Sequence, residues 1–339
     1  MEQTNVLVTG GTGFLGSEVV KKLVELRRYS VTVIDINPPS LGTQAFSTVR
    51  YVRANILSPT ELAEVFAESQ PAVVVHTAGI VPDGQARYSK SGKAAVFQVN
   101  VEGTRNVIQA AKECGARGLV FTSSVTVVVD EMGKDFVNAD EEWPTGRATL
   151  VYGQSKALAE DLVLAANTSD FSTCALRAAP IFGPSDVIIP TLHALIPTSS
   201  FILGEGTNLV DFVYLSNIAD AHVLAVQNLL NSGTTAGQAI FITNGEPITS
   251  RDLCLSVWKE FHHVPRWSIS VPVGLAWWLG LFAEVVGWIS GAEGSLSRGV
   301  VLDGSSTRYF SIRKARRLLG YDPRVSMPEA VKLTCQVRI

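Results

Sequence analysis

Short apolar runs rich in β-branched residues alternate with longer helix-like stretches through the first half of the chain. The strand-like runs read NVLVTG, SVTVIDIN, RYVRAN, AVVVHTAG and GLVFTSS. Helix-like stretches occur between or after them, at residues 17–28, 59–69 and 96–114 and around LVYGQSKALAE. Apolar strands separated by helices are typical of a parallel sheet that is covered on both faces. With right-handed crossovers, this order predicts an α/β fold of the Rossmann type, a doubly wound parallel sheet.

The alternation breaks off after residue 183. Prolines at positions 184, 190 and 197 interrupt the pattern, and a strand–helix pattern returns in LVDFVYLSNIADAHVLAVQNLL. We expect residues 1–183 to form the Rossmann domain, with 209–245 returning to it. A smaller, interleaved, mostly helical lobe for the substrate would comprise residues 184–208 and 246–304, and a C-terminal helical segment residues 305–339.

One later segment, VGLAWWLGLFAEVVGWI at residues 273–289, is apolar enough to resemble a membrane helix. It reaches the lower limit of about 17 residues for a spanning helix, yet it contains Glu284 and three glycines. We expect a helix packed inside a cytoplasmic protein. The alternative is an interfacial helix whose tryptophans make peripheral contact with a membrane, which would place the protein on the endoplasmic reticulum.

The overall composition narrows the class of protein. Of the 339 residues, 46% are apolar and 17% are charged, and the net charge is −3. This predicts a large interior and argues against nucleic acid as a partner, because no basic stripe is present. The four cysteines form no CxxC pair and no zinc-like spacing with histidine. We expect a reduced, metal-free protein that is not secreted.

A glycine-rich stretch, VTGGTGFLG, follows the first predicted strand and opens the first predicted helix. Its glycines satisfy both GxxGxxG and GxGxxG. Such a loop lets the backbone approach a diphosphate, which the N-terminus of the following helix stabilises. The motif is weak by itself, because glycine turns often follow strands. The predicted cofactor contacts in this loop are Gly10, Gly13, Phe14, Leu15 and Gly16.

An acidic residue at the end of the second predicted strand supports a dinucleotide and indicates which one. Asp35 lies about 20 residues past the glycines, where a carboxylate hydrogen-bonds the adenosine ribose. A carboxylate repels a 2′-phosphate, and no arginine follows Asp35 in DINPPS, so we expect NAD rather than NADP. A strand-end cap is the alternative role for Asp35. Later strand ends add the candidate contacts Asn55, Ile56, His76 and Ala78.

Tyr152 and Lys156 stand four residues apart in LVYGQSKALAE, which places both side chains on one face of a helix. A free phenol has a pKa of about 10, and a neighbouring ammonium group lowers it. Tyr152 would then take the proton from an alcohol whose hydride passes to the cofactor. Chance YxxxK spacings are common, so the pair does not decide the matter alone. Ser124 would hold the substrate oxygen, and Asn100 would support Lys156 through water.

Together with the glycine loop, these side chains resemble the extended short-chain dehydrogenase/reductase family over nearly the whole chain. The resemblance implies hydride transfer with NAD(P) by a Ser–Tyr–Lys triad with an added asparagine, here Ser124, Tyr152, Lys156 and Asn100. It also implies that Pro180 and Ile181 line the nicotinamide, and that the protein is a homodimer paired through helices that include the Tyr152 helix. Where the family usually has aspartate, this chain has Asn55.

Three longer segments narrow the resemblance to the 3β-hydroxysteroid dehydrogenase family, and within it to decarboxylating sterol-4α-carboxylate 3-dehydrogenases. They read FVNADEEWP…YGQSKALAEDLVLAAN, GEGTNLVDFVYLSNIADAHVLA and FSIRKARRLLGYDPRVSMPEAV. The resemblance implies NAD-dependent oxidation of a 3β-hydroxyl on a sterol or triterpenoid to the 3-ketone, with loss of a C4 carboxylate as CO₂.

The sequence offers a separate argument about the substrate. No lysine or arginine occurs between Arg177 and Arg251. A sugar nucleotide needs cations for its diphosphate, whereas an uncharged wall suits an apolar polycyclic molecule. The cation for a substrate carboxylate would come from Arg251, Arg266 or Arg298. The expected wall, unless its residues only pack the lobe, is Ile188, Ile189, Leu192, Leu195, Ile196, Phe201, Ile202 and Leu203.

Three alternatives stay open. A different polycyclic-alcohol dehydrogenase, such as a 3β-hydroxysteroid dehydrogenase/isomerase or a tailoring enzyme for a specialised terpenoid, would release no CO₂. A sugar-nucleotide epimerase would bind UDP. A non-catalytic NAD-sensing module would form no NADH, although Tyr152 and Lys156 argue against it.

Overall fold

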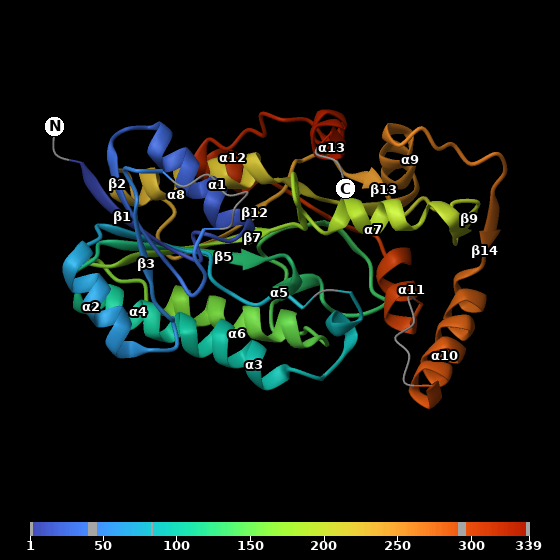
Figure 1. Cartoon of the computed structure of the whole chain (residues 1–339), viewed down its shortest axis with the longest axis horizontal. Helices are drawn as coiled ribbons and strands as arrows, with labels where there is room; N and C mark the ends of the chain where they lie inside the picture. The colour runs from blue at the N-terminus through green and yellow to red at the C-terminus, as the bar shows by residue number, and fades with distance from the viewer. Residues whose placement is uncertain (1–2, 40–45, 83, 291–295, 337–339) are drawn as a thin grey trace.

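A computed structural model describes residues 3–39, 46–82, 84–290 and 296–336. Its centre is a seven-stranded parallel sheet with the strand order β12-β7-β5-β4-β1-β2-β3 (Figure 1). The order changes direction at β1 and β4, as in a doubly wound sheet, so the predicted Rossmann-type fold is confirmed. The strands are β1 (Thr4–Thr9), β2 (Tyr29–Asp35), β3 (Arg50–Arg53), β4 (Val73–His76), β5 (Gly118–Ser124), β7 (Ser172–Ala178) and β12 (Gln238–Ile242).

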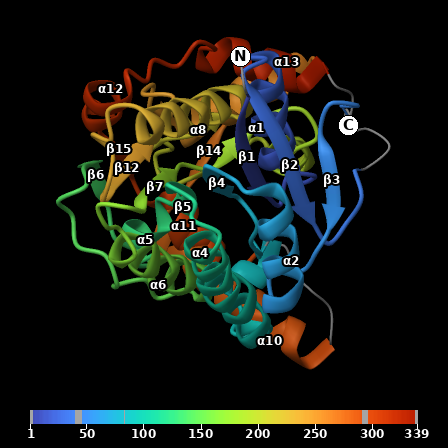
Figure 2. The same ribbon diagram turned by 90° about the vertical axis from the view of Figure 1, so that its left-hand side faces the viewer.

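Helices cover both faces of this sheet (Figure 2). One face carries α1 (Phe14–Glu25), α8 (Leu215–Leu230) and α12 (Arg313–Leu319), and the other carries α2 (Pro59–Ser69), α4 (Thr104–Glu113) and α6 (Val151–Ala165). The strands are apolar on both sides for this reason. In β1, Val6 and Val8 pack into the first face and Leu7 into the second.

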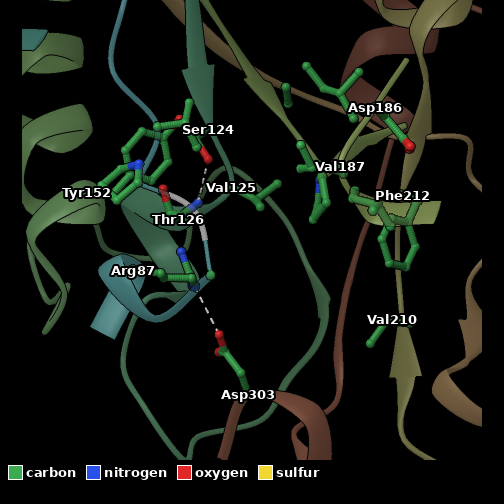
Figure 3. A pocket seen from close by; sticks show the side chains of 18 of the residues that line it. Arg87, Ser124, Val125, Thr126, Tyr152, Asp186, Val187, Val210, Phe212 and Asp303 are labelled. Carbon is green, nitrogen blue, oxygen red and sulfur yellow. Dashed lines mark hydrogen bonds and ion pairs between the residues drawn. The ribbon is translucent and has the colours of Figure 1, made fainter. Parts of the chain in front are cut away.

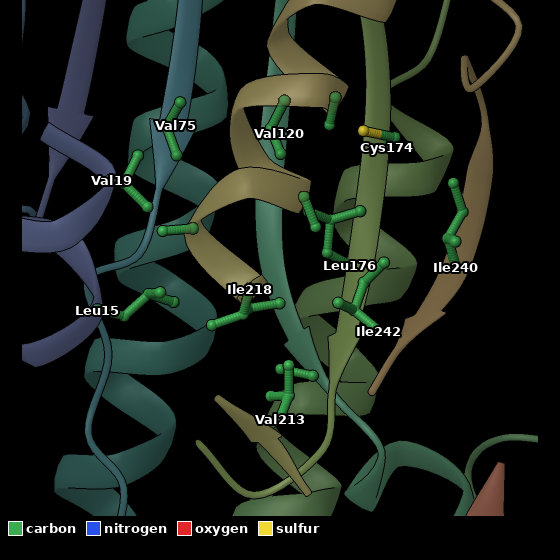
Figure 4. Packing of buried hydrophobic residues seen from close by; sticks show 14 of the residues in the cluster. Leu15, Val19, Val75, Val120, Cys174, Leu176, Val213, Ile218, Ile240 and Ile242 are labelled. Atoms are coloured by element: carbon green, nitrogen blue, oxygen red, sulfur yellow. The ribbon is translucent and has the colours of Figure 1, made fainter. Parts of the chain in front are cut away.

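The larger core cluster lies between the sheet and the helices α1 and α8 (Figure 4). Val19 from α1 and Ile218 from α8 are fully buried against strand residues such as Val75 and Leu176. Each such side chain stabilises the fold by about 1.5–3 kcal/mol. This packing fixes the strand ends, and the strand ends position the site.

Two of the predicted helices differ from the structure in detail. The first helix begins at Phe14, inside the glycine-rich stretch, and not at residue 17. The helix expected at 96–114 consists of α3 (Lys93–Phe97), the π-helical segment η2 (Gln98–Gly103) and α4. Single π-helical turns are frequent at functional sites.

The second half of the chain builds smaller elements beside the carboxyl ends of the strands. A separate core forms between α7 (Ile188–Ala194), α9 (Ser250–Glu260) and α13 (Met327–Gln336). Short strands join segments that are far apart in the sequence. A four-stranded sheet contains β13 (Ile248–Thr249), β10 (Leu209–Val210), β15 (Arg308–Phe310) and β6 (Phe136–Ala139). One strand pair joins β8 (Ile181–Phe182) to β11 (Val213–Tyr214). Another joins β9 (Phe201–Leu203) to β14 (Ile269–Val271). The remaining short helices are η1 (Gly84–Tyr88), α5 (Thr126–Val129) and η3 (Ile196–Thr198).

The prediction of a packed helix at residues 273–289 is wrong. This segment forms α10 (Val273–Ser290), which contacts α11 (Arg298–Ser305), but within α10 only Ala276 and Gly280 are buried. Trp278 is 64% exposed and Trp288 is 86% exposed. By length and composition α10 could cross a membrane, and Figure 1 shows it at the end of the molecule away from the main sheet.

Candidate active site

A cavity of about 1690 Å³ lies at the carboxyl ends of the sheet strands. Loops that follow β1, β2, β3, β4, β5 and β7 line one part of it, and residues of α7, β9, α9 and α11 line the other. Open α/β sheets bind their ligands at this edge. Pockets for a single small ligand have volumes of about 300–1000 Å³, so this cavity has room for a dinucleotide and a second molecule.

The glycine loop forms a cradle in which side chains would not fit. Gly10 has a φ of +68°, and a Cβ atom there would lie 2.7 Å from the backbone nitrogen of Ala78. A Cβ atom on Gly16 would lie 2.1 Å from the Gly10 carbonyl oxygen. Gly13 caps α1, whose first residues Phe14 and Leu15 also line the cavity. This close approach of backbone to a helix N-terminus fits a diphosphate.

The other candidate cofactor contacts come from the ends of β2, β3, β4 and β7. The carboxylate of Asp35 accepts hydrogen bonds from the backbone nitrogens of Thr12, at 3.2 Å, and Asn37, at 3.0 Å. Asp35 therefore braces the glycine loop and also lines the cavity. This position fits a strand-end cap as well as a contact to the adenosine ribose. The structure also places Asn55, Ile56, Ala78, Pro180 and Ile181 in the cavity lining.

His76 lies outside the cavity lining, unlike the other candidate contacts. Its side chain is fully buried between Thr9, whose Oγ1 is 2.6 Å from Nδ1, and Thr104, whose Oγ1 is 3.0 Å from Nε2. Burial, together with the charge of Lys156, lowers the pKa of His76 to about 3. A neutral histidine held between two hydroxyls is a packing element, and the following residues Thr77, Ala78 and Gly79 reach the cavity instead.

Ser124 and Tyr152 face one another across the end of β5 and the start of α6 (Figure 3). Burial raises the pKa of the Tyr152 phenol to about 12, against lowering effects of a hydrogen bond with Ser124 and of the charge of Arg87. Asp130 raises the same pKa. The sequence predicts Lys156 as the cation that lowers it, whereas in the structure the cation with this effect is Arg87.

Lys156 lies on the same face of α6 as Tyr152 but deeper. It is 6% exposed, and its Nζ donates to the carbonyl oxygen of Thr122 at 2.6 Å and lies 4.3 Å from the centre of the Phe121 ring. Burial lowers the pKa of Lys156 to about 7, and the nearby Glu160 opposes this shift. Burial thus disfavours the charged form of Lys156.

Asn100 occupies the π-helical segment and is almost fully buried. Its Nδ2 donates to the Ser155 Oγ and to the Ile80 carbonyl, each at 3.0 Å, and its Oδ1 accepts from the Ile80 nitrogen at 2.7 Å. It thereby ties the loop after β4 to the helix that carries Tyr152 and Lys156. The structure gives it a direct contact with α6 through Ser155, and its expected link to Lys156 through water stays a prediction.

A cluster of ionic side chains that the sequence did not indicate lies next to Tyr152. Arg87 pairs with Asp130 through Nη2 at 2.6 Å and with Asp303 through Nε at 3.0 Å. Asp130 in turn accepts from the backbone nitrogen of Gly153 at 3.2 Å, which connects the cluster to the residue after Tyr152. Figure 3 shows Arg87 and Asp303 joined below Ser124 and Tyr152.

The opposite wall of the cavity is apolar, as the absence of lysine and arginine between Arg177 and Arg251 predicts. Six of the eight expected residues line it, while Ile189 and Ile196 pack into the core beside α9. Figure 3 shows Val187, Val210 and Phe212 on this side as well, together with one carboxylate, Asp186. The residues confirmed in it are Ile188, Leu192, Leu195, Phe201, Ile202 and Leu203.

The fold and the site together define a class. The structure combines a doubly wound sheet, a glycine cradle after the first strand, and a tyrosine and a lysine one helical turn apart on α6. This combination is found in short-chain dehydrogenases/reductases. The particular family follows from sequence comparison. The model of the 3-beta hydroxysteroid dehydrogenase/isomerase family matches residues 7–273, and the chain belongs to this family.

Several relatives match almost the entire chain. The decarboxylating sterol-4-alpha-carboxylate 3-dehydrogenase of Saccharomyces cerevisiae is 37% identical over 97% of this chain and 96% of its own length. The human protein of the same name is 33% identical, with 97% and 87% covered. Among solved structures, UDP-glucose 4-epimerase from Thermotoga maritima has a TM-score of 0.74 at 20% identity, with 98% of both chains covered. At that identity the likeness shows the fold alone.

Proposed function

We propose that the protein oxidises a 3β-hydroxyl group on a sterol- or triterpenoid-like substrate with NAD⁺, and that a C4 carboxylate leaves as CO₂. The observation that carries this proposal is the facing pair Ser124 and Tyr152, in a chain 37% identical to a relative that is named as a decarboxylating sterol-4-alpha-carboxylate 3-dehydrogenase. The glycine cradle fits a dinucleotide, and Asp35 favours NAD over NADP because a carboxylate repels a 2′-phosphate.

The proposed chemistry has two stages, oxidation at C3 and loss of the carboxylate at C4. Bound NAD⁺ would supply the acceptor for the hydride on C3. Ser124 holds the substrate oxygen while Tyr152 takes its proton, and the carbon–oxygen double bond forms. In the resulting β-keto acid the C4–carboxylate bond breaks, and its electron pair moves into an enolate at the C3 oxygen. Hydrogen bonds from Tyr152 and Ser124 stabilise that enolate, and a proton then adds at C4.

The cavity supports an apolar substrate. Its wall opposite Tyr152 is built mainly from aliphatic and aromatic side chains, which suits a fused-ring skeleton better than a sugar diphosphate. The cavity also reaches Ala276 and Leu279 of α10. A ligand that dissolves in membranes would therefore contact apolar side chains of α10 as well as those of the wall opposite Tyr152.

The test compares two sterols that differ only at C4, each supplied with NAD⁺. A 3β-hydroxy-4α-carboxysterol should give NADH and CO₂ in equal amounts, and the same sterol without the carboxylate should give NADH alone. Formation of NADH from both without any CO₂ would instead assign a dehydrogenase of the non-decarboxylating kind. Protection of the protein against heat by UDP, with no NADH from either sterol, would assign a sugar-nucleotide enzyme.

We also propose that α10 contacts a membrane peripherally, which would place the enzyme on the endoplasmic reticulum, and that two chains pair through α6. The exposure of Trp278 and Trp288 supports the membrane contact. Leu158 on α6, which is 47% exposed, supports the pairing of two chains. Replacing both tryptophans with serine should release the protein from phospholipid vesicles. A Leu158→Glu variant should sediment as a monomer if the pairing occurs.

A further inference from the structure

Arg87 lies on the cavity wall beside the catalytic pair, and its side chain is 23% exposed. Two carboxylates from distant parts of the chain fix its position: Asp130 follows α5, and Asp303 belongs to α11. The described hydrogen bonds use its Nε and Nη2, so in the part of the chain that the structure describes Nη1 has no protein acceptor. A guanidinium held in this way is rigid and keeps donors available to a ligand.

The same cluster contains more donors than acceptors. Asp303 accepts from Arg87, from the Tyr88 hydroxyl at 2.8 Å and from Nη1 of Arg308. Arg308 also lines the cavity, and its Nε and Nη2 atoms are buried without a partner among the described residues. A buried donor left unpaired costs about 1–3 kcal/mol. Arg87 is held by Asp130 and Asp303, and Arg308 by Asp303, so donors of both guanidinium groups stay unpaired among the described residues. A carboxylate is an acceptor that matches guanidinium geometry.

We infer that Arg87, supported by Arg308, binds the carboxylate of the substrate. The inference rests on the proposed function and adds the residue that selects a carboxylated sterol over an uncarboxylated one. The carboxylate stands on C4, the carbon next to the hydroxyl-bearing C3. With the C3 oxygen on Ser124 and Tyr152, its partner must lie beside the phenol, where Arg87 is found (Figure 3).

The three arginines that the sequence offered for this role are placed less well. Arg251 lines the cavity, but it donates to the Ser199 carbonyl at 2.8 Å and stacks on Trp258 in α9. Arg298 pairs with Glu284 of α10 at 2.8 Å. Arg266 is exposed on the surface. Neither Arg298 nor Arg266 belongs to the cavity lining.

The test is the ratio of kcat/KM for the 4α-carboxysterol to kcat/KM for the matched sterol without the carboxylate. Loss of a hydrogen bond to a charged group costs about 1.5–3 kcal/mol, so Arg87→Gln should lower this ratio about ten- to a hundredfold. Arg87→Lys, which keeps the charge, should restore part of it. The matched control is Arg251→Gln. Its ratio should stay within about threefold of the wild-type ratio, which is less than the tenfold change that 1.4 kcal/mol would cause.

The ratio separates recognition from a structural role, because a general disturbance of the site slows both substrates alike. An unchanged ratio in Arg87→Gln would overturn the inference, and so would loss of the preference in Arg251→Gln. If the wild-type protein oxidises neither sterol, the proposed function fails. Binding of the carboxylate is then measured at equilibrium, without turnover. Quenching of tryptophan fluorescence should show weaker binding of the carboxysterol to Arg87→Gln than to wild type, and equal binding would overturn the inference.

Discussion

Arg87 and Tyr152 share one wall of the cavity, and the guanidinium group of the first lowers the pKa of the phenol of the second. Burial outweighs this effect and holds that pKa at about 12. Lys156, one turn further along α6, contacts the Thr122 carbonyl and is itself brought to a pKa of about 7 by burial. In its proposed role as proton acceptor, Tyr152 therefore needs charges nearby that lower the pKa of its phenol.

The pH dependence of sterol oxidation should report these charges. Tyr152 accepts a proton only as the phenolate, so kcat/KM should rise with pH while the pH is below the phenol's pKa. Arg87→Gln removes a charge that lowers this pKa and should move the rise to higher pH. Asp130→Asn removes a charge that raises it and should move the rise to lower pH. Profiles of kcat/KM against pH measure both shifts, and shifts in the same direction would contradict the assignment.

Asp35 should determine the choice of cofactor. Its carboxylate lies in the cavity at the end of β2, where a 2′-phosphate would meet a like charge. Asp35→Asn keeps an oxygen for the Thr12 or Asn37 nitrogen and removes the charge. The ratio of kcat/KM with NADP⁺ to that with NAD⁺ should then increase about tenfold, the effect of 1.4 kcal/mol. No change in this ratio would leave Asp35 with a bracing role alone.

His76 should make the fold sensitive to acid. Its pKa is about 3 in the folded protein and about 6.5 when unfolded, so the unfolded chain binds the additional proton between these values. The contribution of His76 to the free energy of unfolding is therefore fully present above about pH 6.5. It decreases as the pH falls toward 3, by up to about 1.4 kcal/mol per pH unit.

The measurement for this prediction is urea unfolding across that pH range. His76→Asn should lower stability at neutral pH, because Thr9 and Thr104 lose a shared partner, and should make the pH dependence shallower. His262→Asn is the matched control: His262 is exposed and has a φ of +57°, a conformation that asparagine tolerates. An equally steep pH dependence in both variants would rule out His76 as the source.

The parts of the site that local spacing determines can be predicted from the sequence. The glycine cradle depends on a strand–turn–helix of consecutive residues, and Tyr152 and Lys156 are neighbours on one helix. Arg87 has no such signal, because its partner Asp303 lies 216 positions away and the two meet only in the folded chain. The identity of the cation next to the phenol therefore depends on tertiary structure.

The same distinction applies to α10 within the fold. A helix that is apolar on all sides has the same sequence pattern whether it is buried in a core or exposed at a surface. Length and composition predict the helix at residues 273–289 correctly, but the exposure of Trp288 depends on which elements surround it. The seven-stranded sheet lacks this ambiguity, since continuous apolar strands need cover on both faces.

The central claim is that Tyr152 is the proton acceptor of a decarboxylating sterol dehydrogenase. Its most direct test is the rate of NADH and CO₂ formation from a 3β-hydroxy-4α-carboxysterol by wild type and by Tyr152→Phe. The wild type should form both products in equal amounts, and the variant should lose about 10²–10⁴-fold of this rate while it keeps its melting temperature. Turnover by Tyr152→Phe at the wild-type rate would contradict it.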